Sequence, residues 1–145
     1  MNYWIFKVNP EFYRIDARML NPTPRITWQV VQHRDEIRRG DLAFIWRTGM
    51  LNGIMALLQI DSDPVEMADL PFERGYYVFP EEEIIRTRVL GTLVRRFPLI
   101  PADYLRSYPG LEDLSVFNGF QGMWNFPVTA EEGLILNSLV KAEVL

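Results

Sequence analysis

The chain has 145 residues, 48% of them hydrophobic, with no cysteine, one histidine and a formal net charge of −4. This length and apolar content predict one folded domain over residues 1–145 and argue against disorder. The composition excludes disulfides and thiol nucleophiles and argues against a metal site, and no apolar run approaches the ~20 residues of a membrane span. Because the N-terminus lacks a signal-peptide pattern, we expect a cytoplasmic protein. We also expect that it uses no cofactor.

Two-residue alternation predicts a first strand over residues 3–8, with Trp4, Phe6 and Val8 on one core-facing side. The sequence then predicts a short helix over 13–20, a proline loop near residue 23, a strand or turn over 28–31, a helical turn within 32–39, a strand over 42–47 and a return strand over 54–60.

The second half begins with residues 61–83, which we expect to be mostly loop because they contain three prolines and a glycine. A long strand over 82–94, a helix starting near 101, a turn at 109–110 and a last strand over 125–128 follow. Thr129 and Glu132 have capping-box spacing and predict a helix to about residue 140. About four to six strands with short helices favour a small, curved barrel.

Charge is spread unevenly along the chain. Residues 61–83 hold eight acids and one arginine, whereas residues 84–106 hold five basic side chains and one acid. Thirteen of the fifteen cations are arginine, which suits phosphate contacts and stacking. The net charge argues against nucleic-acid binding, but its distribution leaves that function open. The arginines either contact phosphate or lie on a solvated surface.

Three tryptophans give the strongest functional signal because they lie beside loops, glycines and arginines. Trp28 follows the proline loop, Trp46 lies near the end of a strand, and Trp124 precedes the last strand. Large aromatic rings in such places can hold a flat ring between π faces. Trp28 either lines a pocket or plugs a loop, and Trp124 is either a pocket wall or an exposed patch. Alternation puts Trp46 on the side of Leu42 and Phe44, which favours the core over ligand contact.

Three segments match one family in order: residues 3–10, residues 37–54 with the turn Arg38-Arg39-Gly40-Asp41, and residues 120–132. On these segments, which span essentially the whole chain, the sequence resembles an EVE domain, a PUA-like domain related to YTH domains. The resemblance implies an α+β fold, a PUA-like mixed β pseudo-barrel of about five to six strands with short peripheral helices.

The resemblance also implies a non-catalytic module that holds a modified base, flipped from DNA or in single-stranded nucleic acid. That base would be a methylated or hydroxymethylated cytosine, or N6-methyladenine, and a nuclease or other effector could act in trans. By resemblance, Asn9 and Gln29 contact the base and Trp28 forms a wall. Further family positions near the pocket are Trp46, Gly122 and Asn125.

The residues themselves support parts of this picture. Asn9 and Gln29 carry amides suited to a Watson–Crick edge. Arg38, Arg39 and Arg47 flank the central strand and are expected to contact phosphate. In contrast, the acids of the 61–83 stretch would repel phosphate if they lay beside the pocket.

The chain departs from the family pattern at three places. Many members have Gly-Thr-Asn-Phe near the end, where this chain has Gly122-Met123-Trp124-Asn125. The loop that supplies a second cage aromatic in YTH-type domains here offers Phe72, Tyr76 and Tyr77, and Gly133 stands where relatives have an aromatic. Phosphate-binding and dinucleotide fingerprints are absent, and no paired acid–base motif is visible, so we expect no enzyme. The alternative is a non-catalytic module that binds a small planar metabolite or a partner protein through the same pocket.

Overall fold

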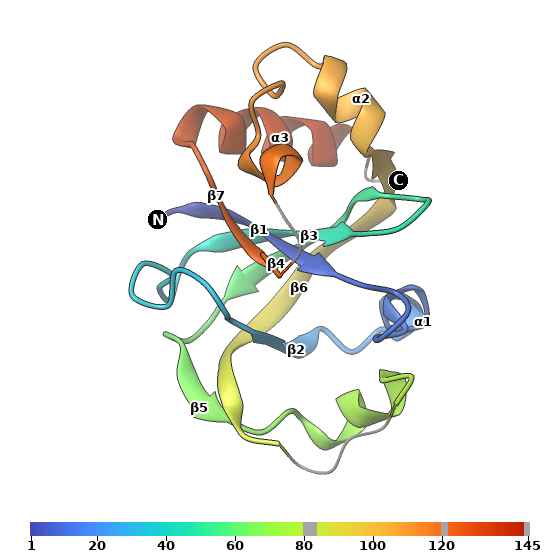
Figure 1. Cartoon of the computed structure of the whole chain (residues 1–145), viewed down its shortest axis with the longest axis vertical. Helices are drawn as coiled ribbons and strands as arrows, with labels where there is room; N and C mark the ends of the chain where they lie inside the picture. Colours follow the sequence, from blue (N-terminus) through green and yellow to red (C-terminus); the bar gives the residue numbers. More distant parts are fainter. Residues whose placement is uncertain (80–83, 120–121, 144–145) are drawn as a thin grey trace.

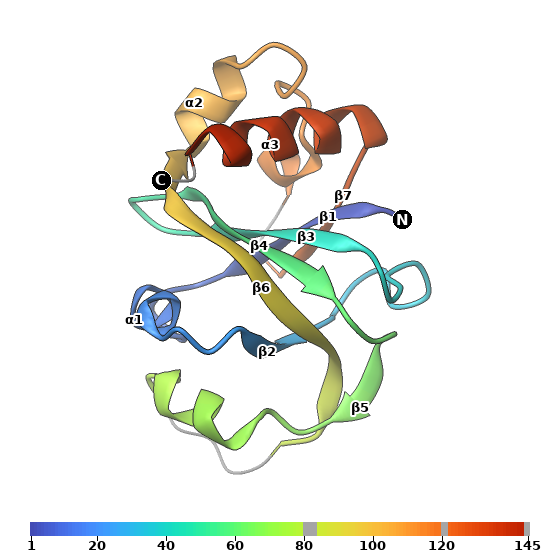
Figure 2. The same ribbon diagram turned by 180° about the vertical axis from the view of Figure 1, so that it is seen from behind.

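The computed structural model describes residues 1–79, 84–119 and 122–143. These residues form one mixed β-sheet with short helices on both sides, and the longest helix, α3, crosses the upper part of the molecule (Figures 1 and 2). The elements are β1 (Tyr3–Val8), α1 (Ile15–Leu20), β2 (Arg25–Gln29), β3 (Leu42–Arg47), β4 (Gly53–Ile60), β5 (Val65–Met67), the 3-10 helix η1 (Pro71–Tyr76), β6 (Arg86–Pro101), α2 (Ala102–Ser107), the 3-10 helix η2 (Ser115–Asn118), β7 (Asn125–Val128) and α3 (Ala130–Glu143).

The sheet follows the order β2-β6-β4-β3-β1-β7, with β5 paired to β6. β1 runs parallel to β3, and the other strand pairs are antiparallel. The 16-residue β6 pairs with three strands, and in Figure 2 it runs from beside β5 to the start of α2. The expected mixed α+β architecture is confirmed, but the described part has seven strands rather than five to six and is not closed into a barrel.

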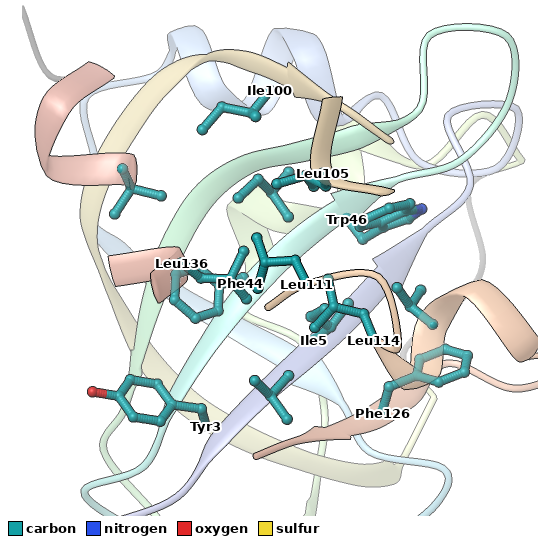
Figure 3. Packing of buried hydrophobic residues seen from close by; sticks show 14 of the residues in the cluster. Tyr3, Ile5, Phe44, Trp46, Ile100, Leu105, Leu111, Leu114, Phe126 and Leu136 are labelled. Atoms are coloured by element: carbon teal, nitrogen blue, oxygen red, sulfur yellow. The ribbon is translucent and has the colours of Figure 1, made fainter. Parts of the chain in front are cut away.

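Both faces of the sheet are buried, so alternating side chains of one strand enter different cores. Tyr3 and Ile5 of β1 join a core under α2, η2 and α3 (Figure 3). Trp4 and Phe6 join a second core on the other face, which includes Ile15 of α1. The expected core position of Trp4, with 2% of its surface exposed, is confirmed.

The elements differ from the sequence expectations mainly in residues 61–101. The stretch expected to be loop contains β5 and η1, and β6 continues past residue 94 to Pro101. Pro98 is tolerated there because the β4–β6 register shifts between Ile54, opposite Ile100, and Ala56, opposite Arg96. A proline has no N–H for the ladder, and such an irregularity is where a strand can accept one.

Local signals at the start of α3 are confirmed. Thr129 Oγ1 accepts the backbone N–H of Glu132 (3.1 Å), and Glu132 Oε1 accepts the N–H of Thr129 (3.0 Å). Gly133 then lies against Tyr3, where an added Cβ would be 2.1 Å from a Tyr3 ring carbon. The Tyr3 ring thus leaves no space for a side chain at position 133.

Candidate functional site

A cavity of about 310 Å³ opens beside the end of β1, the strand β2 and the segment at and after η1. Its volume is at the lower end of the ~300–1,000 Å³ usual for ligand sites. Five aromatic side chains from distant parts of the sequence line it: Phe12, Tyr13, Trp28, Tyr77 and Trp124. The fold therefore creates an aromatic recess that no single stretch of the chain contains.

Trp28 forms one wall of this cavity and is half-buried. It is fixed in β2, where it pairs with Val89 of β6. Its indole stacks on the fully buried Phe6, with ring centroids 6.5 Å apart and an interplanar angle of 26°. The core thus orients the indole, while part of its surface still faces the cavity.

Trp124 forms a second wall and is held by Gln32, which follows β2. The Gln32 side-chain carbonyl accepts the backbone N–H groups of Trp124 (2.9 Å) and Asn125 (3.2 Å). The Gln32 amide nitrogen donates to the Gly122 carbonyl (3.0 Å). In return, Asn125 Oδ1 accepts the N–H groups of Val31 (2.7 Å) and Gln32 (3.1 Å). These five bonds, which we name the Gln32–Asn125 clamp, join the two tryptophan-bearing segments.

The clamp explains two of the family positions. Gly122 and Asn125 were expected near the pocket, but neither lines the cavity. Asn125 is fully buried, and its Nδ2 has no hydrogen-bond partner within the part of the chain that the structure describes. Both residues therefore join the Trp124 segment to the segment that follows β2.

Asn9 and Gln29 bring amide groups to the cavity, as the sequence predicts. Asn9 Oδ1 accepts the backbone N–H of Glu11 (2.9 Å), which fixes its side chain. Among the described residues, no hydrogen bond engages Asn9 Nδ2 or the Gln29 amide. These groups retain donors and an acceptor for the edge of a flat ligand.

A buried charged network lies behind Tyr13. Tyr13 donates to Glu73 Oε2 (2.6 Å), and the fully buried Arg18 donates through Nε to Glu73 Oε1 (2.6 Å). Arg18 also donates to the carbonyls of Thr23 (3.1 Å) and Arg25 (2.8 Å). Burial raises the pKa of Tyr13, and the adjacent Glu73 carboxylate adds to that rise. Burial also raises the pKa of Glu73, against the opposing effect of hydrogen bonds from Tyr13 and Arg18.

A second network centres on Asp69. Its carboxylate accepts hydrogen bonds from Thr27 Oγ1 and from the Tyr77 hydroxyl (2.6 Å), and it pairs with Arg88 (3.3 Å). Burial and the Asp69 carboxylate raise the pKa of Tyr77. Asp69 and Glu73 are each paired with an arginine. These two acids of the 61–83 stretch therefore repel phosphate less than unpaired carboxylates would.

The expected phosphate-binding arginines do not reach this cavity. Arg47 pairs with a carboxylate on α1, Arg38 donates to nearby backbone carbonyls, and the backbone N–H of Arg39 donates to the 61–83 stretch. The cations that line the cavity are instead Lys7 and Arg86. Burial lowers the pKa of Lys7.

Trp46 requires a correction. It is 4% exposed, packs edge-to-face on Phe117 (5.9 Å, 72°) and lies in the core under α2, η2 and α3 (Figure 3). That core is on the opposite face of the sheet from Phe6 and Trp28. The alternation that favoured the core was the correct signal, and ligand contact by Trp46 is ruled out by its position.

Several cavity residues carried no clear sequence signal. Tyr13 reaches the site through a β-bridge to Tyr77 and a hydrogen bond to Glu73, both about sixty residues away in sequence. Phe12 and Tyr13 follow the strand-ending Asn9, and two aromatics at the end of a first strand were the available hint. Arg86, the first residue of β6, lines the same cavity as the end of β1. No local sequence pattern predicts that these two segments meet.

Comparison with solved structures finds the same fold in other proteins. Solved structures cover nearly the whole chain: Rpa0253 of Rhodopseudomonas palustris (18% identity, TM-score 0.68, 98% of this chain and 94% of that one) and a protein of Leishmania major (17%, 0.67, 98% and 96%). Human THYN1, solved in complex with DNA containing 5-methylcytosine, is 21% identical with a TM-score of 0.65 over 97% of this chain and 98% of that chain.

The family follows from the sequence match. The EVE domain model matches residues 2–139, so the chain belongs to the EVE domain family. The expected family and its PUA-like fold are thereby confirmed. No protein with a curated description matches the chain.

Two further observations concern other kinds of site. Across residues 1–79, 84–119 and 122–143, no three His, Cys, Asp or Glu side chains are grouped so that they could hold a metal ion. In the same residues, no helix has both the length and the apolar character needed to cross a bilayer.

Proposed function

We propose that this chain binds nucleic acid through a modified base that enters the cavity between Trp28 and Trp124. The proposal rests on one observation: the half-buried Trp28, whose indole stacks on the core residue Phe6, lines this cavity together with Asn9 and Gln29. Human THYN1, a structural relative, was solved with DNA containing 5-methylcytosine, which supports methylated or hydroxymethylated cytosine as the first candidates. N6-methyladenine is the second candidate base.

Stacking on one aromatic wall does not supply enough free energy to hold a base that has left a duplex. Stacking on one aromatic contributes roughly 1–3 kcal/mol per base, and extruding a base from a duplex costs a few kcal/mol. Hydrogen bonds from Asn9 and Gln29 would supply the remainder, because Asn9 Nδ2 and the Gln29 amide have no hydrogen-bond partner among the described residues. A methyl group buried against the aromatic walls adds only about 1 kcal/mol, so we expect a preference of several-fold rather than absolute selectivity.

The site acts by binding. The buried Tyr13–Glu73–Arg18 and Asp69–Arg88 groups are paired with one another and support the walls. We therefore assign the domain no reaction of its own, and any processing of the bound nucleic acid would come from a separate effector protein.

The proposal is tested with labelled single-stranded oligonucleotides that carry one 5-methylcytosine, 5-hydroxymethylcytosine, N6-methyladenine or unmodified base. Fluorescence anisotropy should show tighter binding to at least one modified strand, and the affinity should fall steeply as salt rises. Trp28→Ala should remove the preference, whereas Trp28→Phe should retain part of it because a π face remains. Tyr104→Ala, on the exposed surface of α2, is the control for a lost aromatic.

Two outcomes would redirect the assignment. Equal affinity for all strands in the wild-type protein would remove the modified base from the proposal. Binding of a neutral planar compound without any response to salt would favour the alternative, a module for a small metabolite.

A further inference from the structure

The tip of the β3–β4 hairpin exposes two adjacent apolar side chains that the fold does not bury. Met50 is fully exposed, and Leu51 is 67% exposed. Single exposed apolar residues are ordinary on a protein surface, but two neighbours at the end of a hairpin form a projecting apolar point. We call these two residues the hairpin tip.

The hairpin tip is supported rather than loose. The Arg47 guanidinium donates to the Leu51 carbonyl (3.0 Å) and pairs with Asp16 of α1 (3.1 Å). On the return side, the Asn52 carbonyl accepts the N–H of Ala102 (2.9 Å). These contacts hold the tip on both sides, so its apolar side chains project from a fixed base.

The hairpin begins at the rim of the cavity. The Thr48 N–H donates to the Val8 carbonyl (3.0 Å), and Val8 lines the cavity. Gly49 lies against Pro10, where an added Cβ would be 3.9 Å from the proline ring, and Pro10 adjoins the cavity residue Asn9. Residue spacing then places the tip within about 15 Å of the rim.

We propose that the hairpin tip inserts into a DNA duplex where the modified base has left the stack. This inference rests on the proposed function and extends it from single strands to base pairs. Proteins that open or kink a duplex commonly insert Met, Leu or Phe between base steps, and a flipped base leaves an apolar gap of that kind. The hairpin tip offers that chemistry beside the cavity, and burial of Met50 and Leu51 in the gap would offset part of the unstacking.

The test compares duplex and single-stranded probes with the same central 5-methylcytosine. Replacing both tip residues (Met50→Ser with Leu51→Ser) should weaken duplex binding about tenfold while changing single-strand binding less than about twofold. Leu134→Ser is the matched control, because Leu134 is 61% exposed on α3 and should leave both affinities unchanged. The loss should shrink on a duplex in which the 5-methylcytosine is mispaired, since that base is easier to extrude.

A second readout reports the insertion itself. A 2-aminopurine placed next to the 5-methylcytosine should brighten when wild-type protein binds the duplex and should stay dim with the double variant. Three results would each overturn the insertion of the hairpin tip. The double variant could bind the duplex as tightly as wild type, it could lose equal affinity for duplex and single strand, or the wild-type protein could bind only single strands. A wild-type protein without preference for the modified single strand would instead overturn the proposed function, and with it the inference that rests on it.

Discussion

The Gln32–Asn125 clamp predicts that a residue outside the cavity controls the cavity. Gln32→Ala removes three hydrogen bonds, one to Gly122 and two from the N–H groups of Trp124 and Asn125. A typical net contribution of about 1 kcal/mol per bond, reduced because Gln32 is partly exposed to water, gives a loss of about 2 kcal/mol. For a chain of this size, that loss lowers Tm by roughly 4–8 °C.

The effect on binding should exceed the effect on folding. Gln32→Ala keeps the two clamp bonds that Asn125 Oδ1 accepts, but it removes those that hold the backbone of Gly122 and Trp124. The Trp124 wall is then less firmly placed against Trp28, so affinity for the preferred modified oligonucleotide should fall about tenfold even where the protein is fully folded. Gln32→Glu keeps the acceptor for both N–H groups but loses the donor to Gly122, and it should retain an intermediate affinity. Gln59→Ala is the control, because Gln59 is exposed and its side chain donates a hydrogen bond to Asp61.

Urea denaturation and anisotropy titration measure the two effects separately. A Gln32→Ala protein that is less stable but binds as tightly as wild type would refute the idea that the clamp positions the wall. Identical behaviour of Gln32→Ala and Gln32→Glu would show that the two accepted N–H bonds are not the important ones.

Three further expectations follow from the buried groups. Gly133→Ala should destabilise the protein by about 1–2 kcal/mol in urea denaturation, because the new Cβ overlaps Tyr3; an unchanged midpoint would contradict this packing. Above pH ~10, Tyr13 loses its proton in the unfolded chain but keeps it in the native protein, because its native pKa is raised. The free energy of unfolding should therefore fall by up to about 1.4 kcal/mol per pH unit. Tyr13→Phe should make this fall less steep in urea denaturation at several pH values. Glu73→Gln should cost about 3 kcal/mol because the buried Arg18 loses its carboxylate partner, and adding Arg18→Met to that variant should recover part of the loss. Additive losses of the two substitutions would argue against the ion pair.

Local patterns in the sequence predicted the elements well where those patterns were strong. Alternation gave β1 its bounds at Tyr3–Val8 and assigned Trp46 to the core, and the Thr129–Glu132 spacing gave the start of α3. In contrast, β5 and η1 lie in a proline-rich, acidic stretch whose local composition indicates loop, and their structure depends on pairing with β6 and on the buried Glu73.

The site was predicted only in part because its residues meet through long-range contacts. Family resemblance identified Trp28, Asn9 and Gln29, which do line the cavity. It could not separate a residue that lines the cavity from one that supports a wall of it, and Asn125 proved to be hydrogen-bonded to a chain segment 94 residues away. For the same reason, Arg47 was expected to contact phosphate but pairs with Asp16.

The four tryptophans provide the most direct test of the cavity assignment, because two line the cavity and two are buried in separate cores. Indole N–H resonances of ¹⁵N-labelled protein would be followed during titration with a single strand carrying 5-methylcytosine and with its unmodified counterpart. We predict that the modified strand shifts Trp28 and Trp124 at lower concentration than the unmodified strand, while Trp4 and Trp46 stay in place. Binding that leaves Trp28 and Trp124 unshifted would contradict the claim that a modified base occupies this cavity.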